Sequence, residues 1–162
     1  MNRLGVFIDG PNLYSAARGL GMQLDFGKLL EHFDPNFAVY VTALNPDGAH
    51  DPVVKLTDYL AYNGYRVVTK PAKVVEGRTK GNMDIELALE IIQQIDHLDE
   101  FVIFTGDGDF APLVKFLHAR GKLVTTVCSS SHTADDLRRV VDDFIPLESL
   151  RDQLSRPEAA NG

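Results

Sequence analysis

The segment at residues 101–110, FVIFTGDGDF, constrains the fold of this chain more than any other. Its four mostly apolar residues run directly into a turn rich in glycine and aspartate, which is typical of a short buried strand. Asp109 then opens an apolar-periodic stretch with Pro112 near its start, which predicts a helix. Asp107 and Asp109 are therefore expected at the carboxyl end of a central strand, where open α/β sheets bind ligands.

The rest of the chain repeats this alternation. Residues 4–8, 37–44, 65–68 and 122–127 read as strands, and residues 144–147 form a short apolar piece near the end. Helices are expected at about 10–19, 24–33, 52–62, 83–98, 111–120 and 132–140. Strands that alternate with helices favour parallel βαβ units, so the predicted fold is a three-layer, doubly wound α/β domain with a mainly parallel sheet. We expect one domain at residues 1–150 and a flexible C-terminal tail at 151–162, frayed from Ser155 onward.

Composition and net charge limit the cellular environments and binding partners that we expect for this chain. The single cysteine, Cys128, excludes an internal disulfide and favours a reducing, cytoplasmic environment. The first apolar run stops at Asp9, too early for a signal peptide, and no stretch approaches the roughly 20 apolar residues of a membrane span. The net charge of −7 argues against indiscriminate binding to nucleic acid, although a local basic track would still allow binding.

Four aspartates are expected to converge on one site. Asp9 ends the first strand and Asp107 follows the fourth, and the usual doubly wound order makes these two strands neighbours. The expected buried stripe of the helix at 83–98 consists of Ala88, Ile91, Ile92 and Ile95, and Asp84 is in phase with it, four residues before Ala88 and eight before Ile92. Asp107 and Asp109 repel each other unless a cation or a proton intervenes. Hard oxygen ligands suit Mg²⁺ or Mn²⁺, and one or two such ions would support in-line attack on a phosphodiester.

Each of these residues also has a purely structural interpretation. Asp9 or Asp109 could cap the helix that follows it, and the helix dipole favours an acid such as Asp84 in a first turn. Asn12 could cap a helix or orient a water or a phosphate. The Thr105 hydroxyl could join the cluster or belong to an ordinary strand end. Capping explains one aspartate of the Asp107–Asp109 pair and not both.

A basic stretch precedes the Asp84 helix. Residues 66–80 carry five basic residues against one acid, a local charge of +4 that leaves −11 for the rest of the chain. This stretch is either a solvated hairpin or a track for a phosphate backbone, and Tyr62 and Tyr65 just before it could stack on bases or pack in the core. The candidate phosphate-binding residues are Lys70, Lys73, Arg78 and Lys80.

Other chemistries fit less well. The five histidines are scattered with no i,i+4 pair, which disfavours zinc, and the calcium-loop template lacks its acids and its glycine. An Asp-x-Asp motif after a strand is also found in haloacid dehalogenase phosphatases. In those enzymes the motif follows the first strand and carries a threonine where Ala111 stands here.

Three blocks of the sequence resemble a known family. Residues 6–13 (VFIDGPNL), 80–85 (KGNMDI) and 105–110 (TGDGDF) are similar to the signature blocks of the NYN domain, in the LabA-like branch of the PIN-like nuclease superfamily. The resemblance extends over about residues 1–150, and residues 134–147 are similar to the family's closing helix and strand. The family's acidic metal-binding positions fall on Asp9, Asp84, Asp107 and Asp109. Asn12 and Thr105 lie beside them, and Lys80 matches a basic residue often found before the Asp84 block.

This resemblance implies an Mg²⁺- or Mn²⁺-dependent endoribonuclease that acts in RNA processing or turnover. The four aspartates would hold the metal and position the attacking water, Asn12 and Thr105 would orient ligands, and the basic stretch would bind the RNA backbone. An alternative is an RNA-binding or regulatory module that keeps the fold without catalysis. An exposed sheet edge or helix could also pair two copies into a homodimer.

Overall fold

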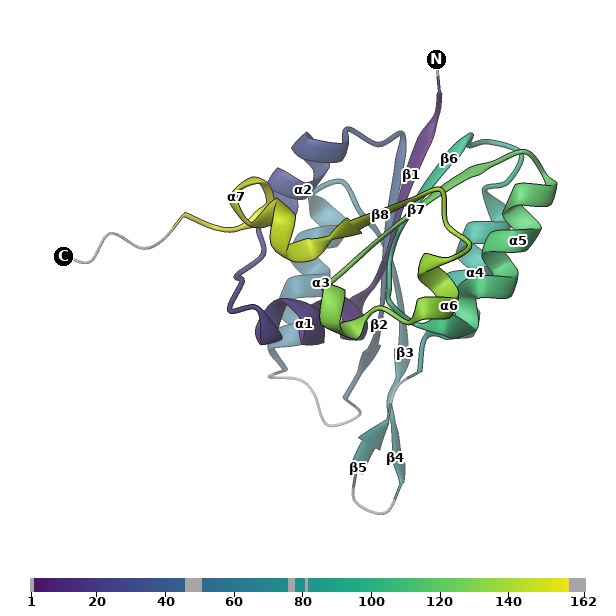
Figure 1. Cartoon of the computed structure of the whole chain (residues 1–162). Coiled ribbons are helices and arrows are strands. Elements are labelled where there is room, and N and C mark those ends of the chain that lie inside the picture. Colours follow the sequence, from purple (N-terminus) through teal and green to yellow (C-terminus); the bar gives the residue numbers. More distant parts are fainter. Residues whose placement is uncertain (1, 46–50, 76–77, 81, 158–162) are drawn as a thin grey trace.

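The protein forms a single central sheet with helices on both faces. The computed structural model describes residues 2–45, 51–75, 78–80 and 82–157, without the side chains of residues 74–80. Six strands lie in the order β3-β2-β1-β6-β7-β8, and every neighbouring pair is parallel. The predicted three-layer, doubly wound α/β fold is confirmed (Figure 1).

The strand order reverses at the centre of the sheet. The chain moves from β1 outward to β2 and β3, and then returns to place β6 on the other side of β1. The apolar piece expected near the C-terminus is the edge strand β8, parallel to β7. The strands of the sheet are β1 (Leu4–Asp9), β2 (Phe37–Leu44), β3 (Arg66–Pro71), β6 (Glu100–Phe104), β7 (Leu123–Cys128) and β8 (Asp143–Pro146).

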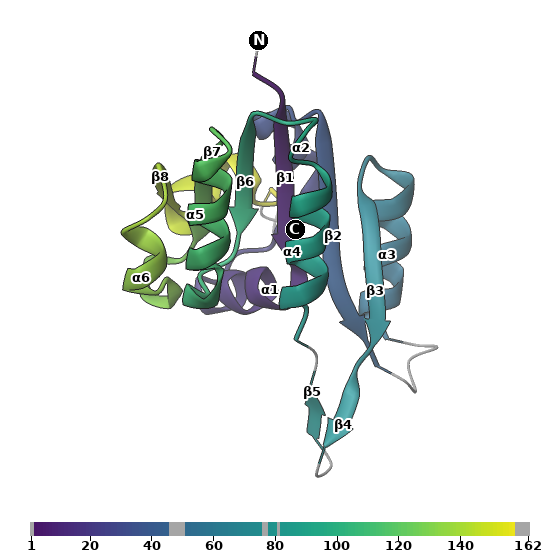
Figure 2. The same ribbon diagram turned by 90° about the vertical axis from the view of Figure 1, so that its right-hand side faces the viewer.

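The helices divide between the two faces (Figures 1 and 2). One face carries α1 (Gly10–Gly19), α2 (Phe26–Phe33), α3 (Pro52–Tyr62) and α7 (Arg151–Leu154). The other carries α4 (Asp84–Gln93), α5 (Ala111–Ala119) and α6 (Asp135–Arg138). Short 3₁₀ turns, η1 (Gly108–Phe110), η2 (Ser130–His132) and η3 (Leu147–Leu150), join some of these elements. A separate antiparallel hairpin, β4 (Lys73–Val75) with β5 (Arg78–Lys80), projects beyond the carboxyl end of the sheet.

The central strands are buried on both faces. Along β1, Val6 and Ile8 pack with the α1 and α2 side, whereas Phe7 packs with the α4 and α5 side, and all three are fully buried. This follows from the two-residue side-chain period of a strand, which sends neighbours to opposite faces. The continuous apolar runs in the sequence are therefore those of a parallel sheet covered by helices.

Two predicted helices are too long. The helix expected at 83–98 spans Asp84–Gln93, because the N–H groups of Gln94 and Ile95 donate to the carbonyls three residues back and tighten the chain into turns. The helix expected at 132–140 is reduced to α6, because the preceding segment bonds elsewhere. The Thr133 hydroxyl donates to Ser129 O and the Ala134 N–H donates to Gly106 O.

Two details of the site helices also differ from expectation. Asp109 does not cap the helix after β6. Asp107 is the N-cap, and its carboxylate accepts a hydrogen bond from Asp109 N–H at 2.9 Å. On α4, Ile92 lies outside the buried stripe with 42% of its surface exposed, whereas Leu87 and Ile91 are fully buried. Of the predicted stripe, Ile91 and Ile95 are buried and Ala88 packs against the core, so only the assignment of Ile92 is wrong.

The chain stays attached to the domain past residue 150. Leu154 of α7 is fully buried, and its carbonyl accepts a hydrogen bond from Asp25 N–H at 2.8 Å. Ser155 bridges Leu24, and Arg156 N–H donates to Gln23 O. The predicted fraying from Ser155 is therefore wrong as far as Arg156, and residues 158–162 of the expected tail lie outside the described part of the chain.

Candidate metal centre

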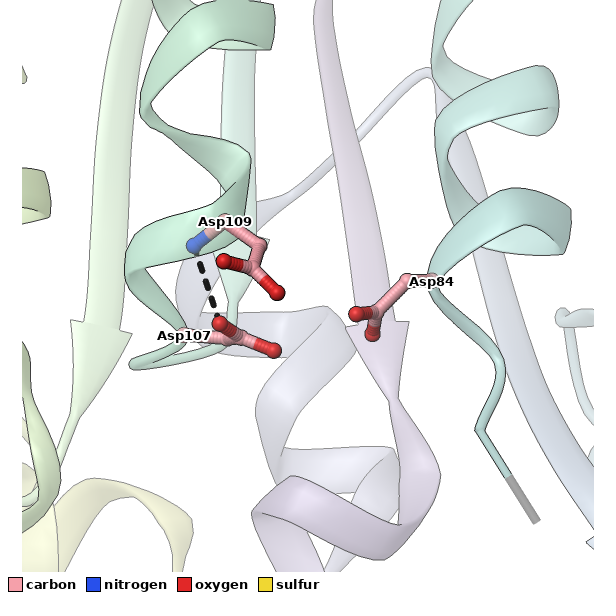
Figure 3. Close-up of side chains that lie close together, drawn as sticks. All are labelled: Asp84, Asp107 and Asp109. Carbon is pink, nitrogen blue, oxygen red and sulfur yellow. Dashed lines mark hydrogen bonds between the residues drawn. The ribbon is translucent and has the colours of Figure 1, made fainter.

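Three aspartates from two separate segments meet at the carboxyl edge of the sheet. Asp84, Asp107 and Asp109 each offer a carboxylate oxygen, and these oxygens all lie within 4.8 Å of one another. Figure 3 shows Asp84 pointing from the start of α4 toward Asp107 and Asp109. We call these three residues the acidic trio.

The loop after β6 is built to present two of the three carboxylates. The hydroxyl of Thr105, which is fully buried, accepts a hydrogen bond from Asp107 N–H at 3.2 Å. Asp107 in turn accepts from Asp109 N–H, so each residue fixes the backbone of the next. The Thr105 side chain thus positions the loop through its backbone.

Asp84 enters the trio as the first residue of α4. Its N–H donates to the side-chain oxygen of Asn82 at 2.8 Å, which ties down the start of the helix. Partial burial, and then the negative charge of Asp107, raise the pKa of the Asp84 carboxyl. Protons and metal ions therefore compete for this side chain.

Asp9 lies next to the trio without joining its 4.8 Å group. It ends β1, is 7% exposed and caps α1 by accepting a hydrogen bond from Asn12 N–H at 3.3 Å. Burial raises its pKa to about 6, the Asn12 hydrogen bond opposes that rise, and the charges of Asp84 and Asp107 add to it. The structural interpretation of Asp9 as a cap is therefore confirmed, and its carboxylate is also held within the field of the trio.

Asn12 contacts β7, which is two strands from β1 in the sheet. Its side-chain oxygen accepts a hydrogen bond from the thiol of Cys128 at 3.6 Å, at the end of β7. This contact links the first turn of α1 to β7 close to Asp9. A role in orienting a substrate group remains a prediction for Asn12.

The basic stretch is placed beside this centre by β3 and the β4–β5 hairpin (Figure 2). Lys70 forms an ion pair with Glu86 of α4 at 2.9 Å, whereas Lys73 is exposed. The side chains of Arg78 and Lys80 lie outside the described residues. Tyr65 is buried and donates its hydroxyl proton to Phe26 O, so it packs in the core, whereas Tyr62 is 88% exposed.

Sequence reasoning did not identify two basic residues next to the trio. Lys115 of α5 and Arg139, just after α6, line a groove that begins at Asp109. Single basic residues on helix surfaces carry no spacing signal, and these two are 24 positions apart in the chain. Only the packing of α6 against the loop after β6 reveals their proximity.

The donor set fits a hard divalent cation. The trio offers only carboxylate oxygens, which Mg²⁺ and Mn²⁺ prefer, and partial burial together with the charge of Asp107 raises the pKa of Asp84, a cost that a bound cation would offset. No histidine or cysteine belongs to this group, so within the described ranges the centre does not have the ligands of a zinc site.

Comparison with known proteins agrees with this arrangement. A family model of the NYN domain matches residues 3–148. This chain belongs to the NYN domain family. This chain is 30% identical in sequence to the low amplitude and bright protein LabA of Synechococcus elongatus, and the match covers 97% of this chain and 90% of LabA.

The fold is also found in a solved structure. The crystal structure of a protein of unknown function from Vibrio parahaemolyticus superposes with a TM-score of 0.78, covers 96% of each chain and shares 21% sequence identity. NYN domains are generally nucleases, and the acidic trio of this NYN domain is a group that could hold a metal ion. In the described part of the chain, no helix is both long and apolar enough to cross a bilayer.

Proposed function

We propose that this NYN domain is a divalent-metal-dependent endoribonuclease that hydrolyses RNA phosphodiester bonds. The observation that carries the proposal is the acidic trio, which brings Asp84 of one helix within 4.8 Å of Asp107 and Asp109 in a family of nucleases. Mg²⁺ or Mn²⁺ is the proposed cofactor and RNA the proposed partner. A role in RNA processing or turnover fits this activity.

The residues have distinct proposed tasks. Asp84, Asp107 and Asp109 hold the ion, and Asp9 adds negative charge beside them. When bound, the ion supplies an activated water and positive charge beside the phosphate. Thr105 keeps the Asp107 loop in position, and Asn12 lies at the border of the site. The side chains proposed to bind the RNA backbone are Lys70, Lys73, Arg78 and Lys80.

A cleavage assay tests the proposal. We expect purified protein to cleave an end-labelled single-stranded RNA in Mn²⁺ or Mg²⁺, and EDTA to stop the reaction. Asp107→Asn should reduce the rate by more than about 100-fold, since even partners of metal ligands often contribute 10–100-fold. Asparagine keeps the oxygen that accepts from Asp109 N–H, so the loop should still fold.

A matched control distinguishes loss of a carboxylate in the trio from loss of any one negative charge on the protein. Asp58 is exposed on α3, on the face opposite the trio, so Asp58→Asn should keep full activity. Full activity in Asp107→Asn would rule out this mechanism. Saturable RNA binding by the wild type, with no metal-dependent product after long incubation, would instead favour a non-catalytic RNA-binding module, for which the net charge of −7 is the observation in favour.

A further inference from the structure

A groove beside the acidic trio is not used by the proposed chemistry. It lies between α5 and α6 and encloses about 530 Å³. Its lining includes Asp109, Pro112, Lys115, Asp136, Arg139 and Val140. Because Asp109 belongs both to the trio and to this lining, the groove opens directly from the candidate metal centre.

The walls of the groove are held together by close packing. Gly108 lies against the start of α6, where a Cβ would come within 3.2 Å of the Ala134 Cβ and 3.8 Å of the Asp136 Cβ. The loop that carries two carboxylates of the trio therefore rests on the helix that leads to Arg139. The position of the Arg139 backbone relative to the trio is thus set by the fold.

The two basic side chains of the groove are available for a ligand. Lys115 is exposed and has no ion-pair partner within the described ranges. Arg139 faces Asp136 at 3.9 Å, with side-chain exposures of 75% and 81%. An ion pair this long and this exposed contributes little, so an incoming anion can replace it at small cost.

The trio lies between this groove and the hairpin. Figure 2 shows α6, α5 and α4 side by side on one face of the sheet, with the β4–β5 hairpin projecting below the start of α4. A strand of nucleic acid that crosses the trio from the hairpin side would next meet Lys115 and Arg139. Pro112 and Val140 give this path an apolar wall suited to a sugar or a base.

We propose that the groove between α5 and α6 binds the phosphate backbone of the RNA on the side of the cut bond opposite the hairpin, with Lys115 and Arg139 as phosphate contacts. This inference rests on the proposed ribonuclease function. It assigns a path for the substrate and identifies two positioning residues that no sequence block contains. The path also gives a chain with an overall negative charge a local attraction for phosphate on both sides of its acids.

Binding measured without catalysis tests the path. The probe is a fluorescein-labelled oligouridylate, and its anisotropy is measured in EDTA over a range of KCl concentrations. For single strands the logarithm of affinity falls by about 0.7 per phosphate contact for each tenfold rise in salt. Lys115→Gln and Arg139→Gln should therefore each weaken binding by about fivefold at 0.1 M salt, and the double variant should lower the salt slope by about 1.4.

Matched controls keep the result specific. Lys55 is exposed on α3, on the other face of the sheet, and Arg120 lies beyond the far end of α5. Lys55→Gln and Arg120→Gln should leave the affinity unchanged. In Mn²⁺, Lys115→Gln should raise KM for RNA cleavage and leave kcat near the wild-type value, which a merely structural role would not produce. Exposed side chains such as these change stability little, so all variants should fold.

The outcomes separate this inference from the function on which it rests. Weaker binding with a reduced salt slope in both groove variants supports the path. If the wild type binds and cleaves RNA while both groove variants match it in affinity, slope and KM, the path is wrong and the ribonuclease stands. If the wild type neither binds nor cleaves RNA, the proposed function fails and the path fails with it.

Discussion

The ionised carboxylate of Asp9 lowers the stability of the folded protein when no metal is bound. Its carboxyl is 7% exposed, and burial together with the charges of Asp84 and Asp107 raises its pKa to about 6. In the unfolded chain the same group titrates near 3.8. Between these values the folded state holds a proton that the unfolded state releases, so stability falls as the pH rises from about 4 to about 6.

The first prediction therefore concerns Asp9→Asn. Asparagine carries no charge and can still accept from Asn12 N–H, so the variant should lack this loss of stability. In EDTA at pH 8 it should be more stable than the wild type by about 3 kcal/mol, the equivalent of a shift of about two pKa units. The difference should shrink toward zero at pH 4.

Urea unfolding at the two pH values measures this difference. Asp136→Asn is the control, because the Asp136 side chain is 81% exposed and its replacement should give the same small change at both pH values. An Asp9→Asn variant that is no more stable at pH 8 than at pH 4, relative to the wild type, would contradict the raised pKa of Asp9.

Some functional and core residues could be identified from the sequence, and others could not. Asp84, Asp107 and Asp109 could be found because each lies at the start of a helix or the end of a strand, where topology brings chain segments together. The chemical role of Tyr65 could not be separated from packing until its hydroxyl was seen bonded to Phe26 O. Lys115 left no signal, because its neighbours in space come from a distant helix.

At the scale of elements, an ion pair with one buried partner attaches an outer strand to the helix that carries Asp84. Arg66 of β3 reaches Glu90 of α4 with two bonds, Nε to Oε2 at 3.0 Å and Nη2 to Oε1 at 3.2 Å. The Glu90 side chain is 8% exposed and that of Arg66 57% exposed. The Arg66 guanidinium stabilises the charged form of the Glu90 carboxylate, which has little contact with water.

Loss of Arg66 should therefore be costly. Arg66→Met leaves the Glu90 carboxylate buried and unpaired, and we expect unfolding free energy to fall by about 2 kcal/mol, less than for a fully buried pair because Arg66 is half exposed. Adding Glu90→Met should recover part of this loss. Urea denaturation measures both effects.

The exposed pair of Arg3 and Asp99 is the matched control. Its atoms are 3.7 Å apart and its side chains are 53% and 39% exposed, so Arg3→Met should cost at most about 1 kcal/mol. Equal losses for Arg3→Met and Arg66→Met would show that burial of Glu90 does not decide the cost.

The turn after β6 requires a glycine at position 106 because neighbouring atoms leave no room for a side chain. At Gly106 a Cβ would overlap the carbonyl oxygen of His132 and lie 2.8 Å from the thiol of Cys128. Gly106→Ala should destabilise the fold by about 2 kcal/mol through overpacking, and it should lower nuclease activity because Asp107 is the next residue. Thermal unfolding and the RNA cleavage assay measure the two effects.

Gly19→Ala is the control for this prediction. Gly19 ends α1, and the nearest atom to a Cβ there is the His132 Cε1 at 3.7 Å, an ordinary contact. This variant should be as stable as the wild type or up to about 1 kcal/mol more stable. A Gly106→Ala variant with wild-type stability would show that the loop can move aside.

The existence of the elements was easier to predict than their ends. Apolar period and turn residues predicted β1, β2, β3, β6 and β7, since these signals are local, whereas the residues of β8 were expected only as a short apolar piece. The end of α4 and the shortening of α6 depend on hydrogen bonds to Ile91, Ser129 and Gly106. The bond from Ala134 N–H to Gly106 O forms only after distant segments have packed, and the other two are local alternatives to helical bonds, so single-sequence patterns place helix ends poorly.

For the whole molecule, the order of the strands explains why the acids meet. Alternating strands and helices predicted that β1 and β6 would be neighbours, and the pairing of Ile8 with Phe104 confirms it. The sequence could not predict that three of the four aspartates form a group within 4.8 Å while Asp9 lies beside it. Distances of this size depend on side-chain packing across both faces of the sheet.

The same arrangement predicts that a divalent cation stabilises the entire domain. An ion held by Asp84, Asp107 and Asp109 binds the folded state in preference to the unfolded chain, in which Asp84 is far from the other two. At a free Mn²⁺ concentration of 100 times Kd the gain is about 2.7 kcal/mol, which for a chain of this length raises Tm by about 5–10 °C. At pH 5 the rise should be smaller, because Asp9, with a pKa of about 6, then holds a proton, and because the pKa of Asp84 is also raised, so protons compete with the ion. Differential scanning fluorimetry with a MnCl₂ titration measures the shift in Tm.

Asp107→Asn should abolish the rise in Tm that Mn²⁺ produces, and Asp136→Asn, outside the trio, should keep it. An equal rise of Tm in Asp107→Asn and in the wild type would mean that Mn²⁺ acts elsewhere on this acidic surface, and the trio would then be an electrostatic feature of the fold and not a metal centre.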